Sequence, residues 1–60
     1  MKTLTPITVY DVESGAPITG RVWALTTDGS LIMKGHSGFI EVPKEGKYFV
    51  QFGKGTLERW

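Results

Sequence analysis

The chain has 60 residues and a mass of 6.6 kDa, so one domain over residues 1–60 is expected. A domain of this size buries only about 60% of the surface that its unfolded chain exposes, and such domains depend on disulfides, metals or partners. The absence of cysteine excludes disulfides, thiolate metal sites and a cysteine nucleophile, and the single histidine excludes a multi-histidine metal site. The sequence therefore predicts no metal and no cofactor, and it favours association with further copies or with another protein.

Seven basic and six acidic residues give a net charge of +1, and they are interleaved from Lys2 to Arg59. Binding dominated by phosphate contacts normally needs a concentrated basic face, so the composition does not favour nucleic acid. No apolar run approaches the length of a membrane span. The segment from Met1 to Pro6 lacks the apolar region of a secretory signal, so synthesis in the cytoplasm without export is expected.

Short runs rich in β-branched and aromatic residues alternate with eight glycines, and no window repeats apolar residues at helical spacing. This pattern predicts short antiparallel strands joined by turns. Asp28-Gly29 is the strongest single hairpin signal, because this pair suits turns that need a positive φ. The expected strands are 4–12, 18–27, 30–34, 39–42, 47–52 and 56–60, with turns at 13–17, 28–29, 35–38, 43–46 and 53–55.

Alternation along each strand predicts which side chains share a face. Ile7 and Val9 are expected on one face of the first strand. Pro6 cannot donate to a ladder, so this end of the strand is expected at a sheet edge or unpaired. In the fifth strand one face is expected to hold Tyr48, Val50 and Phe52.

The second strand can be interpreted in two ways. One face carries Trp23 and Leu25, and the other carries Val22 and Ala24. Trp23 and Leu25 are expected inside because they bury more apolar area. Arg21 would then lie at the rim, with its stem along the core and its guanidinium in water.

Six short strands cannot form one wide flat sheet with a dry face at this size. The predicted fold class is all-β, a small six-stranded antiparallel β-sandwich of the immunoglobulin-like or prealbumin-like kind. A small SH3-like or OB-like barrel is the alternative.

Several stretches occur in a familiar order: Ile7-Thr8-Val9-Tyr10-Asp11, residues 14–20, Val22-Trp23-Ala24-Leu25, Gly38-Phe39-Ile40 and Gly46-Lys47-Tyr48-Phe49-Val50. Together they resemble transthyretin-like and carboxypeptidase-regulatory-like domains over roughly residues 7–52. The resemblance implies a sandwich that stiffens, spaces or presents other molecules. It transfers no catalytic or ligand-binding residue, because no matching motif is present. The chain departs from these families at Arg21, where a small residue is usual, and in being shorter.

Few residues could carry chemistry. His36 and Ser37 are neighbours in a loop, which rarely holds the geometry of a base and a nucleophile, so an exposed loop histidine is expected. The carboxylates lack the spacing of a metal loop, and Asp11 and Asp28 are explained as turn residues. The two glycines in 53–55 lack the following helix of a phosphate loop, so a hairpin is expected there. The sequence does not predict an enzyme.

The aromatic residues are the remaining candidates for function. The core is expected to need four of them: Trp23, Phe39, Tyr48 and Phe52. The predicted partner-binding residues are therefore Trp60, Phe49 and Tyr10, since Trp and Tyr are enriched at protein interfaces. For Trp60 the alternative is that it caps an open end of the core.

The predicted function is a non-enzymatic assembly module that contacts copies of itself or a larger protein assembly. By analogy from the fold, a virion component such as a capsid decoration, tail or baseplate protein is expected. Two alternatives stay open, a small inhibitor of a host enzyme and a barrel that binds single-stranded nucleic acid. No membrane and no small-molecule substrate are expected. In the nucleic-acid alternative the rings named above stack on bases, and the phosphate contacts come from Lys47, Lys54 and Arg59.

Overall fold

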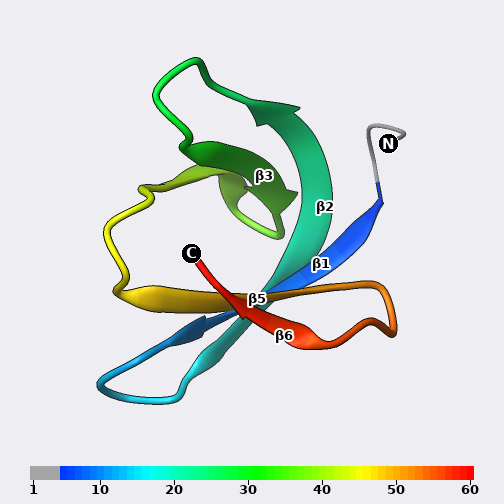
Figure 1. Cartoon of the computed structure of the whole chain (residues 1–60). Coiled ribbons are helices and arrows are strands. Elements are labelled where there is room, and N and C mark those ends of the chain that lie inside the picture. The colour runs from blue at the N-terminus through cyan, green and yellow to red at the C-terminus, as the bar shows by residue number, and fades with distance from the viewer. Residues whose placement is uncertain (1–4) are drawn as a thin grey trace.

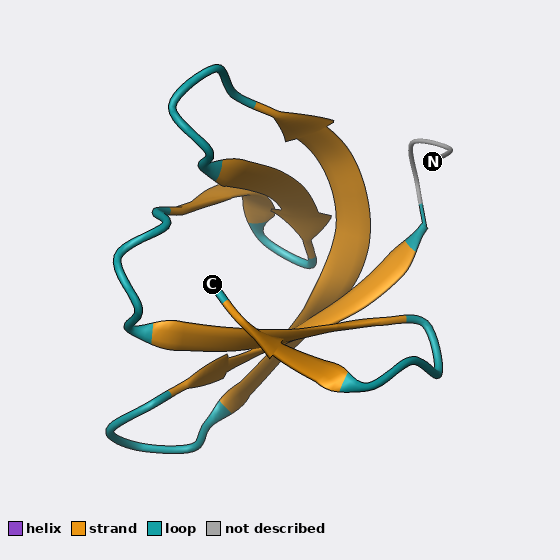
Figure 2. Cartoon of the chain, viewed as in Figure 1, coloured by secondary structure: helices purple, strands orange, loops and turns teal. Residues whose placement is uncertain are grey.

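The computed structural model describes residues 5–60, and every regular element in this range is a β-strand (Figures 1 and 2). The all-β class and the six antiparallel strands are therefore confirmed. Each expected strand is present, although Leu4, the expected start of the first, lies outside the described residues. The strands are β1 Pro6–Asp11, β2 Pro17–Leu25, β3 Leu31–Gly35, β4 Gly38–Val42, β5 Tyr48–Phe52 and β6 Leu57–Arg59.

The six strands form one antiparallel sheet in the order β4-β3-β2-β1-β5-β6. The first four strands make a meander, and the segment 43–47 then carries the chain from the β4 edge to β5, which pairs with β1. Figure 1 shows β2 as a long curved strand that joins β3 to the layer of β1, β5 and β6. The sheet thus folds over itself as one piece, an arrangement closer to the barrel alternative than to two separate sheets.

The inner face of the folded sheet forms the core. Val50 is fully buried, and Tyr48 and Phe52 of the same strand pack against the core, as the alternation predicts. Ile7 and Val9 of β1 are buried as well, so the predicted faces of β1 and β5 are confirmed. The buried cluster contains Ile7, Val9, Val22, Leu31, Met33, Val42 and Val50.

The expected inner face of β2 is wrong. Val22 is 2% exposed, whereas Trp23 is 44% and Leu25 54% exposed. Val22 pairs with the buried Met33, so alternation turns Trp23 to the outer face and the narrow interior takes the smaller side chain. A β-bulge between Val22 and Ala24 then leaves Ala24 on the outer face as well. Leu25 pairs with the buried Leu31 but is the last residue of β2 and stays 54% exposed.

Two further expectations need correction. Phe39, which was assigned to the core, is 59% exposed on β4. Pro6 is not at an edge, since β1 lies between β2 and β5 and Pro6 pairs with Arg21. The Pro6 carbonyl accepts a hydrogen bond of 2.8 Å from the Gly53 amide. A proline is tolerated as the first residue of this central strand, because the sheet loses only the one backbone N–H donor that proline lacks.

Glycines line one end of the inner face where the sheet bends. Gly20 pairs with Gly35, and Gly35 pairs with Gly38, so three neighbouring strands carry no side chain at this level. A Cβ at Gly20 would lie 2.8 Å from the Met33 methyl group and would also meet the backbone of Lys34. The missing side chain therefore lets β2 and β3 approach and leaves room for Met33.

We expect Gly20→Ala to lower the free energy of unfolding by about 2 kcal/mol or more, because the added carbon is driven into backbone. Gly35→Ala is the matched control on the opposite strand. Its added carbon comes closest to the end of the Ile40 side chain, at 3.1 Å, which can move, and the nearest backbone atoms lie 3.7 and 3.8 Å away in ordinary contact. Urea denaturation of both variants gives the comparison, and equal losses would contradict this account of the bend.

The turn between β2 and β3 is held by side-chain hydrogen bonds around Asp28. The Thr26 hydroxyl donates to the Asp28 carboxylate, and the Ser30 amide donates to it at 3.1 Å. Gly29 has φ +91°, the conformation for which Asp-Gly is suited. These hydrogen bonds, that from Thr26 first, lower the pKa of Asp28. The predicted turn is confirmed, and Asp28 is a turn residue.

A lowered pKa in the folded state stabilises the fold while the carboxyl is ionised. This contribution is complete above the unfolded pKa of about 3.9 and is lost as the pH falls through the lower folded pKa. We therefore expect Asp28→Asn to lose less stability than wild type between pH 7 and about pH 2.5. Urea midpoints measured across this range test the difference, and parallel pH profiles would argue against the Asp28 contribution.

Candidate functional site

An exposed aromatic pair lies on the outer face of β2, β3 and β4. Trp23 and Phe39 meet across β3 with ring centroids 5.1 Å apart and planes at 73°. Lys34 lies on β3 opposite Phe39, with its Nζ 5.8 Å from the centre of that ring. We call Trp23, Lys34 and Phe39 the aromatic patch.

The rings of the aromatic patch hold each other in place without being buried. An edge-to-face contact is worth about 0.5–1.5 kcal/mol beyond the area that it covers. Trp23 and Phe39 nevertheless remain 44% and 59% exposed. The bulge in β2 positions Trp23 for this contact, and bulges commonly redirect a side chain in this way. The patch therefore presents a fixed apolar surface to the solvent.

The predicted partner-binding residues lie in two different places. Tyr10 and Phe49 pair directly across β1 and β5, and both are half-buried. The Arg59 guanidinium lies 5.6 Å from the centre of the Phe49 ring. Trp60 instead packs against the core. The structure thus brings Tyr10 and Phe49 together and leaves Trp60 apart from them.

Trp60 closes one end of the core, the alternative that the sequence left open for it. Its ring meets Phe52 edge-on at 6.2 Å, and the Lys44 ammonium lies 4.5 Å from its centre. Its backbone amide donates to the Tyr48 carbonyl, and its carbonyl accepts from the Gly46 amide. The Trp60 Nε1–H group is buried with no hydrogen-bond partner. A role for Trp60 in partner contacts stays a prediction.

Two of the three basic side chains of the nucleic-acid alternative, those of Arg59 and Lys47, have partners nearby. Arg59 donates two hydrogen bonds to the Gly46 carbonyl, at 3.1 and 2.8 Å. Lys47 lies 3.8 Å from the Glu45 carboxylate, although both side chains are largely exposed and such a pair is weak. The bases would also have to stack on rings that lie on opposite faces of the sheet. This set therefore does not form one surface.

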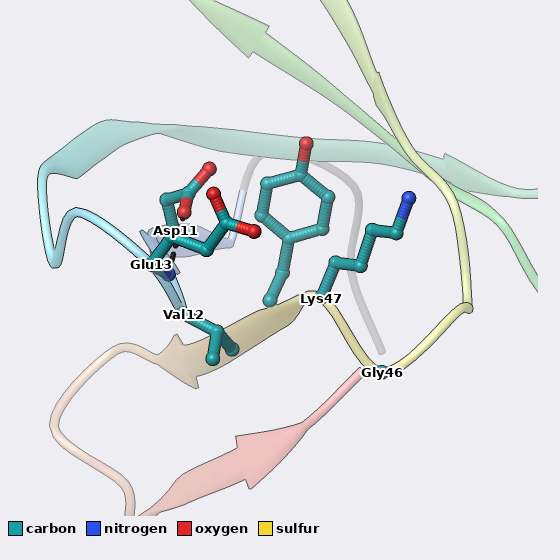
Figure 3. A pocket seen from close by; sticks show the side chains of 6 residues that line it. Asp11, Val12, Glu13, Gly46 and Lys47 are labelled. Atoms are coloured by element: carbon teal, nitrogen blue, oxygen red, sulfur yellow. Dashed lines mark hydrogen bonds between the residues drawn. The ribbon is translucent and has the colours of Figure 1, made fainter.

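A shallow pocket of about 280 Å³ lies between the β1–β2 turn and the start of β5. Figure 3 shows Asp11 and Glu13 on one side of it and Lys47 on the other. The Asp11 carboxylate accepts hydrogen bonds from the Glu13 and Ser14 amides, at 2.8 and 3.2 Å, so it shapes the turn as expected. One of the two carboxylates is thus committed to structure.

His36, Ser37 and the metal-ligating side chains are the other candidates for chemistry within residues 5–60. His36 and Ser37 are exposed in the two-residue turn between β3 and β4, as expected for a loop histidine. Within this range no three metal-ligating side chains lie close enough to share an ion. The same range also contains no helix with the length and apolarity of a membrane span.

Sequence reasoning missed Trp23 and Phe39 as surface residues. Their alternation and size favoured burial, and no residue type in β2 marks the position of the bulge. The only available signal was the ambiguity of the second strand, whose opposite face carries Val22.

No known protein family, curated protein or solved structure matches the chain. The resemblance to transthyretin-like domains therefore stays a prediction, and the function must be inferred from the geometry of the molecule.

We expect Trp60→Ala to lower the free energy of unfolding by about 2 kcal/mol, because it opens one end of the core. Trp60→Phe is expected to stay within about 1 kcal/mol of wild type, since it keeps a ring and removes an unpaired buried donor. Trp23→Ala serves as the control on the outer face, with a loss of no more than about 1 kcal/mol. Equal losses for Trp60→Ala and Trp23→Ala would show that Trp60 does not close the core.

Proposed function

We propose that the chain is a non-enzymatic protein-interaction module that attaches to a protein partner through the aromatic patch. The observation that carries this proposal is the Trp23–Phe39 pair, fixed at 5.1 Å on the outer face while both rings stay exposed. Exposed Trp and Phe at the centre of a patch are typical anchors of protein interfaces.

The chemistry of the aromatic patch favours protein over nucleic acid. The Lys34 ammonium already lies over the Phe39 ring, and the next residue of β4 on the same face, two positions along, is Glu41 with its carboxylate. Base stacking needs open ring faces beside a basic groove. Here the rings meet edge to face and the nearest charges have mixed signs, which suits a mixed apolar and polar protein surface.

Tyr10 and Phe49 form a second, weaker candidate surface on β1 and β5. Both are half-buried, and Arg59 covers part of the Phe49 ring. They offer less uncovered apolar surface than the aromatic patch, so they are better suited to the rim of an interface than to its centre. A place in a large particle such as a virion extends this proposal by analogy from the fold alone.

The test compares Trp23→Ser, Phe39→Ser and wild type in capture and binding experiments. Each substitution is expected to weaken binding to a partner by on the order of 2 kcal/mol while the chain stays folded. Leu57→Ser is the matched control, because Leu57 is a 56% exposed apolar residue on β6, away from the patch. The proposal expects one protein that wild type and Leu57→Ser capture and that both patch variants lose.

The nucleic-acid alternative has its own readout in the same series. Fluorescence anisotropy with labelled single-stranded DNA is measured at about 50 and 200 mM salt. Tight binding that falls steeply with salt, and that the patch substitutions leave unchanged, would replace the proposal with that alternative. Partner capture that all four proteins share equally would also count against the patch.

A further inference from the structure

We propose that β4 pairs antiparallel with β4 of a second copy of this chain, which makes the protein a dimer with one sheet running through both copies. This inference rests on the proposed function and names the first partner of that surface. It starts from the two free edges of the sheet, which differ in length and chemistry.

β4 is one edge of the sheet, and it lacks the short length and the run of charges that usually protect such an edge. Within residues 5–60, β3 is the only strand that pairs with β4. Its five residues, Gly38–Val42, include three apolar side chains and one charge, that of Glu41. An edge strand directs every second pair of backbone N–H and C=O groups outward, and an apolar edge readily pairs with another strand.

β6, the opposite edge, is protected in the usual ways. It spans only three residues, Leu57–Arg59, and two of them are charged. Short and charged edge strands resist pairing with other chains. The contrast identifies β4 as the edge at which a second chain adds.

Charge selects the register of the pairing. A two-fold axis beside Ile40, the middle residue of β4, places Phe39 of one copy opposite Glu41 of the other. An axis beside Glu41 would place two carboxylates directly opposite each other, which is destabilising. The Ile40 register also pairs all five residues of each β4, the most that this edge offers.

In this register the partner's carboxylate lies beside a basic group of this chain. Lys34 pairs with Phe39 and extends over its ring. The Glu41 carboxylate of the second copy would lie on the other side of the same ring. The Phe39 ring would then lie between the Lys34 ammonium and that carboxylate, once on each side of the two-fold axis. Such self-complementarity is what a symmetric interface requires.

The area is modest for a stable dimer. A small specific interface removes about 600 Å² from each partner. That is about one seventh of the 4232 Å² of accessible surface of this chain. The contact must therefore include the side chains of Phe39 and its neighbours in addition to the paired strands. We therefore expect a reversible dimer with a dissociation constant in the micromolar range, about 1–100 μM. The two aromatic patches would lie side by side on its outer surface.

Sedimentation equilibrium of the full chain from about 1 μM to 1 mM tests the dimer. Wild type should dimerise reversibly, and Glu41→Lys and Lys34→Glu should each weaken the association about tenfold or more, because like charges then face each other across the Phe39 ring. The charge-swapped double variant should recover to within about threefold of wild type. Glu58→Lys on β6 is the matched control and should leave the association unchanged, and circular dichroism confirms that each variant is folded.

Two outcomes would overturn the dimer: a wild-type chain that stays monomeric up to 1 mM, or a dimer that neither charge variant weakens and the double variant does not restore. These results are separate from those for the proposed function. If wild type is monomeric while Trp23→Ser still abolishes capture of a different protein, the dimer fails and the interaction module stands. If the dimer forms as described and the patch variants change no other binding, the dimer stands and the proposed interaction module fails.

Discussion

The constraint behind the whole structure is that one short sheet must cover its own apolar face. Sixty residues supply no second layer, and no helix lies against the sheet within residues 5–60. The sheet therefore has to bend until its two ends face each other. The bend is made in β2, where Gly20 leaves room for Met33 and where a bulge between Val22 and Ala24 increases the local twist.

This tight bend sorts the side chains by size. The fully enclosed positions hold aliphatic residues and one methionine, which fit a narrow interior. Larger rings are placed where the interior opens, so Tyr48, Phe52 and Trp60 are only partly buried against the core. Trp23 and Phe39 lie outside altogether, where the fold itself needs no aromatic residue. These exposed rings are the basis of the proposed interaction surface.

Local chemistry in the sequence predicts much of this fold. Asp28-Gly29 forms its turn because the carboxylate of Asp28 binds groups only two residues away. Alternation predicts the inner faces of β1 and β5, since these strands are regular. In β2 alternation leaves both faces open, and the choice by apolar area is wrong because the narrow interior holds Val22 and not the larger Trp23. The path of segment 43–47 across the sheet depends on distant pairing and has no local signal.

Because the sheet bends without closing into a barrel, it keeps two edge strands. The strand order ends at β4 and β6, so the backbone groups on the outer sides of these strands remain unpaired within the sheet. On β6 the short length and charges make this tolerable, and Arg59 further ties the strand to the Gly46 carbonyl. On β4 the apolar edge strand also carries Phe39, half of the exposed aromatic pair. The unpaired edge and the exposed rings are therefore neighbours, because Phe39 belongs to both, and a partner that adds a strand to β4 would also contact Phe39.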